Sequence, residues 1–404
     1  MKILWFPRLQ FDIDKLHITT WREMCRELEK LGAEVKLAVV GGDEKNVLGR
    51  PYLRLPVIKK RFLRGFSFWT GGWFKFIVHY LKFRPDAVIL DISSYFFSLP
   101  FVLWPRRKCV FLVDNRTPVH NKGSNKPTRL NRLAKFYTKL CYTYSEHMLD
   151  GMTVITGHYK RQVTEEYGFD GGNIAVWESG VDPDRFSPEK YRDAEKPVPL
   201  KDKFVLMQHG ELSFNRGIFE TVEALKIVDN DEIALVFLGD IAGRSSARED
   251  LLGLIERLGL GKNVHLLPAV PHWEVPRYLS YADCAVLAYP QIEYWNNNNP
   301  IKLLEFLAMG KVTICTDMWT FRDVLGDRPC GVFIKDNRPE TIAGAINLCY
   351  ENREKLETWG KTGRETIQEH FTWHQQAAKL LGFIEELTAK RNLSSLANGF
   401  VGRS

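Results

Sequence analysis

The chain has 404 residues, of which 45% are hydrophobic, and a formal net charge of +7. That length predicts two domains, and the apolar content is enough to fill the core of each. The seven cysteines show no CxxC spacing, which argues against a zinc site or a disulfide framework and favours reduced thiols in a cytoplasmic protein. The longest apolar stretch, residues 66–81, is interrupted by Lys75 and His79 and is too short to span a bilayer.

The charge is unevenly distributed along the chain. Residues 51–150 contain 18 Lys and Arg against 5 Asp and Glu, whereas the part after residue 190 is slightly acidic. A basic first half predicts an anionic partner: a membrane surface, a lipid phosphate or a nucleic acid. No recognised nucleic-acid-binding module is present, and the acidic second half disfavours that third partner.

Short apolar runs alternate with helical patterns throughout the chain, which is typical of parallel α/β layers. The apolar run at the start of the chain, residues 1–7, is too short for a signal peptide and predicts a strand instead. A helix is expected at 18–31. The expected strands of a first sheet are residues 2–6, 34–40, 87–90, 110–113 and 152–155. Those of a second sheet are residues 204–208, 234–239, 264–267, 284–288 and 313–315.

Composition shifts divide the chain. Residues 1–190 are expected to form one domain and residues 204–370 another, joined by a linker at 191–203 that is rich in Pro, Lys, Asp and Glu. A last helix is expected at 371–390. Residues 391–404 are expected to form a loosely ordered tail.

Polar residues follow the strand at 110–113. Asp114, Arg116 and His120 come directly after it, at the carboxyl end of a parallel strand, where α/β sheets bind ligands. The alternative is a loop salt bridge between Asp114 and Arg116.

Two segments combine basic side chains with apolar ones at helical spacing. In residues 73–83 the basic positions are Lys75, His79 and Lys82, and a second stripe consists of Arg129, Arg132, Lys135 and Lys139. Basic amphipathic helices can lie on anionic bilayers. The alternative for the first segment is a core helix with a solvated edge.

A glycine-bounded loop, residues 210–217, follows an expected strand and precedes an expected helix at 218–228. Its backbone can approach phosphates, and Arg216 stands near the start of the helix. The spacing is neither GxGxxG nor a Walker loop, so a plain strand-to-helix turn is the alternative.

Residues 299–310, NPIKLLEFLAMG, predict a short helix. Asn299 suits the N-cap, Pro300 the first turn and Gly310 the C-terminal stop. Lys302 lies in the first turn, where a cation and the helix N-terminus suit the diphosphate of a nucleotide. Glu305 projects from the same face, where its carboxylate suits the ribose hydroxyls. The alternative is an ordinary capped helix with a Lys–Glu pair on the surface.

This helix resembles the donor-binding helix of retaining glycosyltransferases of family 4. Three more segments match in order: VWESGVDPDRF at 176–186, GELSFNRG at 210–217, and the stretch from Val264 to Asp283. The resemblance implies the GT-B fold, with two Rossmann-like domains facing a cleft and a C-terminal helix that crosses back to the first domain. It also implies transfer of a sugar from a nucleotide diphosphate sugar to a lipid-linked or glycan acceptor, with retention of configuration, in the cytoplasm or at the inner face of the cell membrane.

The resemblance also assigns residues to roles. Family members place a His or Asp on the loop after the strand at 110–113, near the transferred sugar, so Asp114 and His120 are expected there, with Arg116 or the basic stripe at the acceptor. Base contacts are expected from Leu267, Pro268 and Val270. Arg216 and Lys302 are expected to neutralise the diphosphate without a metal ion or other cofactor. The expected donor-binding residues are Gly210, Arg216, Asn297, Asn299, Lys302, Leu303, Leu304 and Glu305.

Two positions depart from the family pattern. Asn297 stands where many members have an acidic residue, with Glu293 nearby as a substitute, and the loop after the first strand contains no glycine. Asp12 and Asp14 in that loop have the spacing of a DxD metal motif, but helix capping is the plainer role for that neighbourhood. These departures leave two alternatives open: a GT-B sugar-nucleotide epimerase, and a non-catalytic subunit that binds nucleotide sugars.

Overall fold

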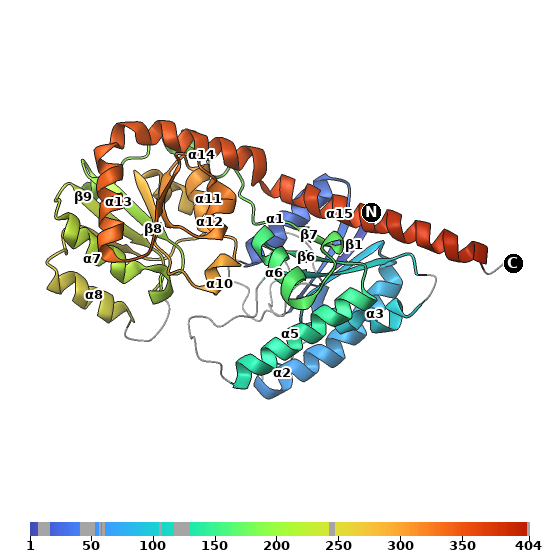
Figure 1. Cartoon of the computed structure of the whole chain (residues 1–404). Coiled ribbons are helices and arrows are strands. Elements are labelled where there is room, and N and C mark those ends of the chain that lie inside the picture. Colours follow the sequence, from blue (N-terminus) through green and yellow to red (C-terminus); the bar gives the residue numbers. More distant parts are fainter. Residues whose placement is uncertain are drawn as a thin grey trace. The chain divides into compact units, whose positions relative to one another are not determined.

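The computed structural model describes residues 1–6, 17–40, 53–55, 58, 61–104, 107–116, 129–241 and 247–401. The chain forms two compact units (Figure 1). Unit 1 consists of Met1–Ser179 and Trp373–Ser404, and unit 2 consists of Gly180–Thr372.

Unit 1 is built on a parallel sheet of seven strands in the order β3-β2-β1-β4-β5-β6-β7. The five predicted strands are confirmed. The two missed strands, β3 and β7, have only three residues each, too few for a clear apolar run. The strands are β1 (Lys2–Trp5), β2 (Glu34–Val40), β3 (Leu53–Leu55), β4 (Ala87–Leu90), β5 (Val110–Asn115), β6 (Gly151–Val154) and β7 (Ile174–Val176).

Helices cover the unit 1 sheet. They are α1 (His17–Lys30), α2 (Arg61–Ser67), the π-helical turn η1 (Phe68–Gly72), α3 (Trp73–Phe83), the 3₁₀ turn η2 (Tyr95–Ser98), α4 (Leu99–Val102), α5 (Arg129–Met148), α6 (Gly157–Tyr167) and α15 (Trp373–Val401). The last helix packs against α1, from the opposite end of the sequence, and both bury apolar side chains in one core.

The C-terminal helix is longer than predicted. α15 continues to Val401, so the prediction of a loose tail from residue 391 is wrong. Arg391 anchors this part of the helix, because its guanidinium pairs with Asp150 and its Nε donates to the Arg107 carbonyl at 3.3 Å. These contacts tie the helix at residue 391 to the rest of unit 1, although the segment has no strong apolar pattern.

Unit 2 is built on a parallel sheet of six strands in the order β10-β9-β8-β11-β12-β13. Its strands are β8 (Phe204–His209), β9 (Ile233–Leu238), β10 (Val264–Leu267), β11 (Cys284–Leu287), β12 (Val312–Thr316) and β13 (Gly331–Ile334), of which only β13 was not predicted. Its helices are α7 (Ile218–Val228), α8 (Ala247–Arg257), α9 (Val275–Ser280), α10 (Glu293–Asn296), α11 (Ile301–Ala308), α12 (Trp319–Leu325), α13 (Pro339–Glu351) and α14 (Leu356–His370).

The boundary between the units lies before the predicted residue 190. Residues 191–203, expected to be a linker, belong to unit 2. Leu200 is buried in the unit 2 core, and Lys196 Nζ donates to Asp283 Oδ2 at 2.9 Å. The polar composition of this segment reflects ion pairs along the surface of the unit.

All seven cysteines are buried thiols, as the sequence predicted. In the part of the chain that the structure describes, no helix is both long enough and apolar enough to cross a membrane.

Each sheet has a topological switch point, where strand order reverses direction. It lies between β1 and β4 in unit 1 and between β8 and β11 in unit 2. Ligands of open α/β sheets bind at the carboxyl ends of the strands at such points. Polar side chains at these two positions are therefore candidates for ligand contacts.

Candidate functional site

The loop after β8 lies at the unit 2 switch point, and its two glycines are required by geometry. Gly210 and Gly217 have φ angles of +101° and +70°, which disfavour other residues. A Cβ on Gly217 would lie 2.0 Å from the Ala288 carbonyl oxygen after β11, and one on Gly210 would lie 2.6 Å from Lys302 Cε. The predicted loop and the predicted donor helix therefore meet at Gly210.

The helix that carries Lys302 begins later than predicted. α11 starts at Ile301, and Pro300 occupies the N-cap with a non-helical ψ of 82°. The prediction that Asn299 caps the helix is therefore wrong, because the Pro300 carbonyl accepts the first-turn bonds from Leu303 and Leu304. The predicted stop at Gly310 is confirmed, since Gly310 has φ +67° and follows the last turn.

Leu303 and Leu304 do not offer groups to a ligand in this arrangement. Their side chains are buried in the unit core, and their amides donate to Pro300 at 2.9 and 3.3 Å. The amide contribution of this helix start to an anion is therefore smaller than predicted.

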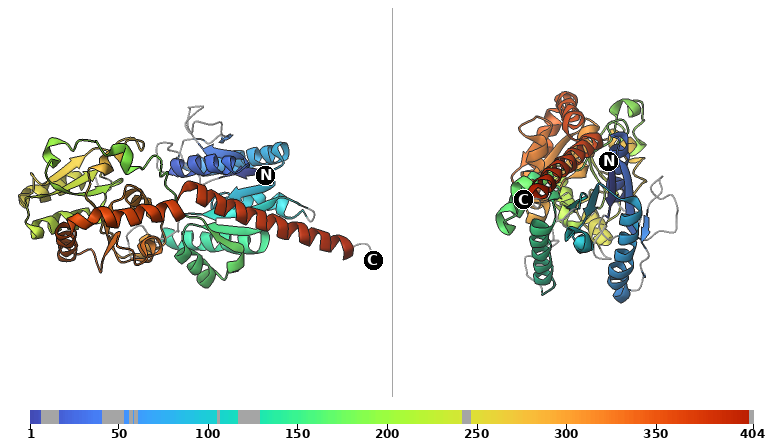
Figure 2. Two further views of the ribbon diagram at one scale, coloured as in Figure 1. Left: turned by 90° about the horizontal axis from the view of Figure 1, so that it is seen from above. Right: turned by 90° about the vertical axis from the view of Figure 1, so that its right-hand side faces the viewer.

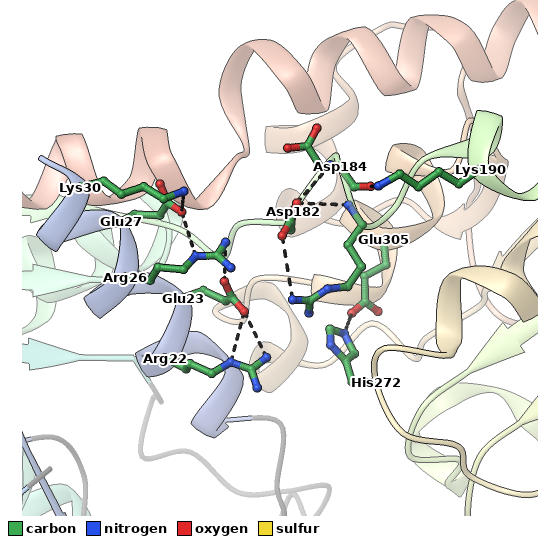
Figure 3. A network of polar contacts seen from close by, with 11 residues as sticks. Arg22, Glu23, Arg26, Glu27, Lys30, Asp182, Asp184, Lys190, His272 and Glu305 are labelled. Carbon is green, nitrogen blue, oxygen red and sulfur yellow. Dashed lines mark hydrogen bonds and ion pairs between the residues drawn. The ribbon is translucent and has the colours of Figure 1, made fainter. Parts of the chain in front are cut away.

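Glu305 is the centre of a buried polar cluster. Its side chain is 1% exposed, and its carboxylate has three basic neighbours. On Oε2, Lys302 Nζ donates at 3.1 Å and His209 Nε2 lies at 3.1 Å. On Oε1, His272 Nε2 lies at 2.6 Å, as Figure 3 shows. The predicted Lys302–Glu305 pair on one helix face is confirmed, but it is buried and not a surface pair.

The charges of this cluster follow from burial and proximity. Burial opposes ionisation of Glu305, but Lys302 and the hydrogen bonds with His209 and His272 outweigh it and hold the pKa of the carboxyl well below its usual range. Burial, together with the positive charge of Lys302, lowers the pKa of His209 to about 4. At neutral pH the cluster therefore consists of a carboxylate, an ammonium group and a neutral His209.

Arg216 lies on the same loop and is held by aromatic rings. Its Nη1 donates to the Tyr289 hydroxyl at 3.4 Å, and its guanidinium carbon lies 5.1 Å from the centre of the Trp295 ring. Trp295 in turn donates its Nε1 to the Asn215 carbonyl at 2.9 Å. The Nε atom of Arg216 is buried with no partner among the described residues, so this side chain retains a hydrogen-bond donor.

The remaining residues predicted on the donor side differ in burial. Asn297 is fully buried, and Glu293 is exposed on α10. Leu267 ends β10 and Val270 packs partly against the core, while Pro268 between them is exposed. His272 follows on the same connection, so the loop that carries the predicted base-pocket residues also contacts Glu305.

Polar residues also gather at the carboxyl ends of the unit 1 strands. Asp114 is buried at the end of β5 and accepts from Thr153 Oγ1 at 2.8 Å. Burial raises the pKa of Asp114 to about 6, although Arg116 and Thr153 act in the opposite direction. Arg116 lies 3.4 Å from the centre of the Trp177 ring and donates to the Trp177 carbonyl at 3.0 Å. Burial lowers the pKa of Arg116 to about 10.

Several predictions fall outside the described residues. They are His120 and the loop after the first strand with Asp12 and Asp14. The described residues contain no group of three or more metal-binding side chains placed to hold an ion. On α5, Arg132, Lys135 and Lys139 are exposed as predicted, while the side chain of Arg129 is not described.

The structure adds residues to both sites that the sequence did not indicate. His209 and His272 were not singled out because their contact with Glu305 is made only in the folded unit. Asp91 follows β4 at the unit 1 switch point and accepts from Ser93 Oγ at 2.7 Å. The available signal was an acidic or imidazole side chain at the carboxyl end of a buried strand, since His209 is the last residue of β8 and Asp91 directly follows β4.

Known protein families match both parts of the chain. The family described as Glycosyltransferase Family 4 matches residues 19–185, and the one described as Glycosyl transferases group 1 matches residues 190–366. The chain belongs to the group 1 glycosyltransferases. One curated relative in this family is the D-inositol 3-phosphate glycosyltransferase of Xylanimonas cellulosilytica, 25% identical over 252 residues. The match covers 60% of this chain and 58% of that relative. The aligned region is therefore little more than half of the relative's length.

Solved structures of glycosyltransferases share the fold over nearly the whole chain. Sucrose-phosphate synthase of Thermosynechococcus elongatus superposes with a TM-score of 0.74 at 16% identity, covering 96% of this chain and 99% of that one. HepE of Anabaena, in complex with UDP, gives a TM-score of 0.74 at 14% identity, covering 95% and 100%. At these identities the likeness concerns the fold alone, and it confirms the predicted GT-B class.

Proposed function

We propose that the protein transfers a sugar from a nucleotide diphosphate sugar to an acceptor hydroxyl. The observation that carries this proposal is the buried Lys302–Glu305 pair on α11, in contact with Gly210 at the unit 2 switch point. A carboxylate kept ionised in a buried site binds a diol well, because each hydrogen bond to it is charge-assisted. The ammonium group one turn earlier supplies the cation that a diphosphate requires.

The roles of the donor residues follow from this arrangement. Glu305 would accept hydrogen bonds from the ribose hydroxyls, while Lys302 and the spare donor of Arg216 would bind the diphosphate. Leu267, Pro268 and Val270 would line the base, since they lie on the connection that also carries His272. UDP sugars are the first donors to test, because the Anabaena structure named above contains UDP.

We further propose a metal-independent reaction with retention of configuration. The bond between the anomeric carbon and the phosphate oxygen breaks as the acceptor oxygen bonds the same carbon on the same face. The acceptor proton passes to the departing phosphate oxygen. Lys302 and Arg216 would stabilise the negative charge on the leaving diphosphate, which is where charge develops in the transition state.

The acceptor is proposed to be lipid-linked or a glycan and to bind unit 1 at the inner face of the cell membrane. Polar side chains at the carboxyl ends of adjacent strands, Asp91 and Asp114, support an acceptor hydroxyl site there. Arg132, Lys135 and Lys139 on α5 support contact with an anionic membrane surface. The family match does not favour the epimerase or the non-catalytic subunit.

The experiment that tests this function combines binding and turnover. UDP-, GDP- and ADP-sugars are screened by thermal shift, and the donor that stabilises the protein is incubated with lipid-linked and soluble acceptors. Formation of a glycoside with the donor's anomeric configuration supports the proposal. Donor binding without transfer to any acceptor would favour the non-catalytic subunit.

A further inference from the structure

The outer face of α5 exposes an apolar stripe that the core does not use. Leu133 and Phe136 are each 65% exposed, and Leu140 is 49% exposed. These positions recur at i, i+3 and i+7, so they lie along one face of the helix. The helix buries a different set, including Thr138, Cys141 and Tyr142. The packing of unit 1 therefore does not explain the exposed stripe.

A basic stripe runs beside the apolar one. Arg132, Lys135 and Lys139 each precede one of the apolar residues by one position, which is a rotation of about 100° around the helix. All three are exposed. The only acidic residue in α5 is Glu146, close to its C-terminal end. This half of the helix thus has the pattern of an interfacial helix, with an apolar stripe flanked by cations.

The segment from α2 to α3 repeats this combination. Phe66, Trp69, Phe74 and Leu81 are exposed along it. The segment contains no Asp or Glu, while Lys82 near its end is exposed. Aromatic side chains with an apolar body and polar surroundings are typical of the membrane–water interface. The core alternative raised for residues 73–83 explains the buried Phe76 and Phe83, and Ile77 and Tyr80, which pack partly against the same core. It does not explain the exposed Phe74 and Leu81.

One short element holds both segments in place. Phe97 in η2 lies 5.9 Å from Phe76 of α3, measured between ring centres, and Tyr95 in η2 lies 5.8 Å from Tyr137 of α5. Ser98 and Tyr144 also share a hydrogen bond of 2.8 Å. Within unit 1, α2 and α5 extend beyond the sheet in the same direction (Figures 1 and 2). The two apolar stripes are therefore fixed parts of one unit.

We propose that the exposed faces of α5 and of the α2 to α3 segment insert apolar side chains into the interface of an anionic bilayer. The inference rests on the proposed membrane contact and deepens it, because charge attracts the protein and apolar insertion retains it. Charge complementarity identifies the occupant: two faces with exposed aromatic residues and almost no acidic side chains fit negatively charged lipid headgroups. A lipid-linked acceptor would then bind unit 1 at the bilayer surface, where the headgroup of the lipid leaves the membrane.

The test is co-sedimentation of the full chain with vesicles of phosphatidylglycerol and phosphatidylcholine at low and high salt. The apolar variant combines Leu133→Ser, Phe136→Ser and Leu140→Ser. The charge variant combines Arg132→Gln, Lys135→Gln and Lys139→Gln. A matched control combines Leu252→Ser and Leu348→Ser, two leucines of unit 2 that are each 45% exposed.

We expect the apolar variant to lose vesicle binding by at least about tenfold at both salt concentrations, because three bulky side chains no longer insert. The charge variant should lose binding mainly at low salt. At high salt the attraction between the basic residues of the wild type and the lipid headgroups is already screened, so removing these charges has little further effect. The control should bind like the wild type, and nucleotide binding by unit 2 should be unchanged in all variants.

Three results would overturn the inference. If the apolar variant binds like the wild type while the charge variant does not, the contact is electrostatic only, and the proposed membrane association survives without insertion. If the control loses as much as the apolar variant, the effect is not specific to this face. If the wild type ignores the vesicles but forms a dimer that the apolar variant abolishes, the stripe is an interface between copies of the chain.

Discussion

His272 Nε2 lies 2.6 Å from Oε1 of Glu305, on the side of the carboxylate opposite Lys302. Both oxygens of the carboxylate proposed to bind ribose are therefore already engaged by basic groups. Of the three neighbours, His272 has the most exposed side chain, at 26%, whereas His209 is almost completely buried. If ribose binds Glu305 as proposed, we expect it to replace His272, the most exposed of these neighbours.

The first prediction concerns the charge of Glu305. Replacing it by Gln keeps the shape but removes the negative charge, so the hydrogen bonds to ribose lose about 1.5–3 kcal/mol and nucleotide affinity falls more than about tenfold. Gln is preferred to Ala, because its amide oxygen can still accept the hydrogen bond from the buried Lys302, whereas Ala would leave that donor without a partner and open a cavity in unit 2. Isothermal titration with the donor nucleotide measures the effect, and Glu340→Gln on α13, which is exposed, is the control. Equal affinity of the two variants would contradict the role of Glu305.

The second prediction concerns His272. In His272→Ala the Oε1 atom of Glu305 is available without displacement of the imidazole, so nucleotide binding should tighten by about threefold to tenfold, the value of one net hydrogen bond. The same titration detects it. Weaker binding in this variant would mean instead that His272 orients the carboxylate for the ligand.

The sequence predicted most of this molecule because most of its signals are local. Strands such as β8 and β11 are continuous apolar runs, and Gly210 and Gly217 mark the loop that needs positive φ angles. The pairing of Lys302 with Glu305 could also be predicted, since residues three apart share a helix face.

What the sequence did not predict depends on distant contacts. His209 and His272 reach Glu305 only because β8 and the loop after β10 end near α11. Asn299 was misassigned as a cap because Pro300 can occupy either the N-cap or the first turn. The helix continues past residue 390, where Arg391 pairs with Asp150, a residue 241 positions away that the local pattern could not indicate.

The third prediction uses the raised pKa of Asp114. The pKa of Asp114 is about 6 in the folded protein, against 3.8 for an ordinary aspartate. Between pH 3.8 and pH 6, Asp114 is therefore protonated more often in the folded protein than in the unfolded chain. Stability is therefore lost as the pH rises through this window, because an ionised Asp114 is buried above it. Asp114→Asn should stabilise the protein at pH 8 by on the order of 1–3 kcal/mol. The gain should shrink at pH 5.

Urea unfolding at the two pH values measures this difference. Glu165→Gln, at an exposed position on α6, is the matched control and should change stability little at either pH. A gain of the same size at pH 5 and pH 8 would show that ionisation of Asp114 is not its cause.

The fourth prediction is that transfer does not require a divalent ion. Because Lys302 and Arg216 can neutralise the diphosphate, the initial rate of glycoside formation in EDTA should stay within about twofold of the rate with added Mn²⁺. The comparison is made with the donor found in the nucleotide screen. Complete loss in EDTA that Mn²⁺ restores would argue against the two-cation mechanism and direct attention to Asp12 and Asp14.

The fifth prediction concerns the contact of α15 with the rest of unit 1. Leu380 is buried in the core shared with α1, so Leu380→Ala should cost about 2–5 kcal/mol of the stability of unit 1. The exposed Glu385 on the same helix provides the control, Glu385→Ala. Hydrogen exchange, read separately for the two units, should show faster exchange in the β1 and β2 strands and unchanged exchange in β8 and β9. Unchanged protection of β1 and β2 would mean that α15 contributes little to their stability.

Because α15 completes a core begun by residues near the N-terminus, the order of synthesis and the order of folding differ in this chain. Unit 2 is encoded as one uninterrupted segment and can fold as soon as residue 372 has left the ribosome. Unit 1 must wait, with the surfaces of α1, β5 and β7 that α15 covers still exposed, until α15 is made. During translation, the first half of this protein is therefore the part most in need of protection from aggregation.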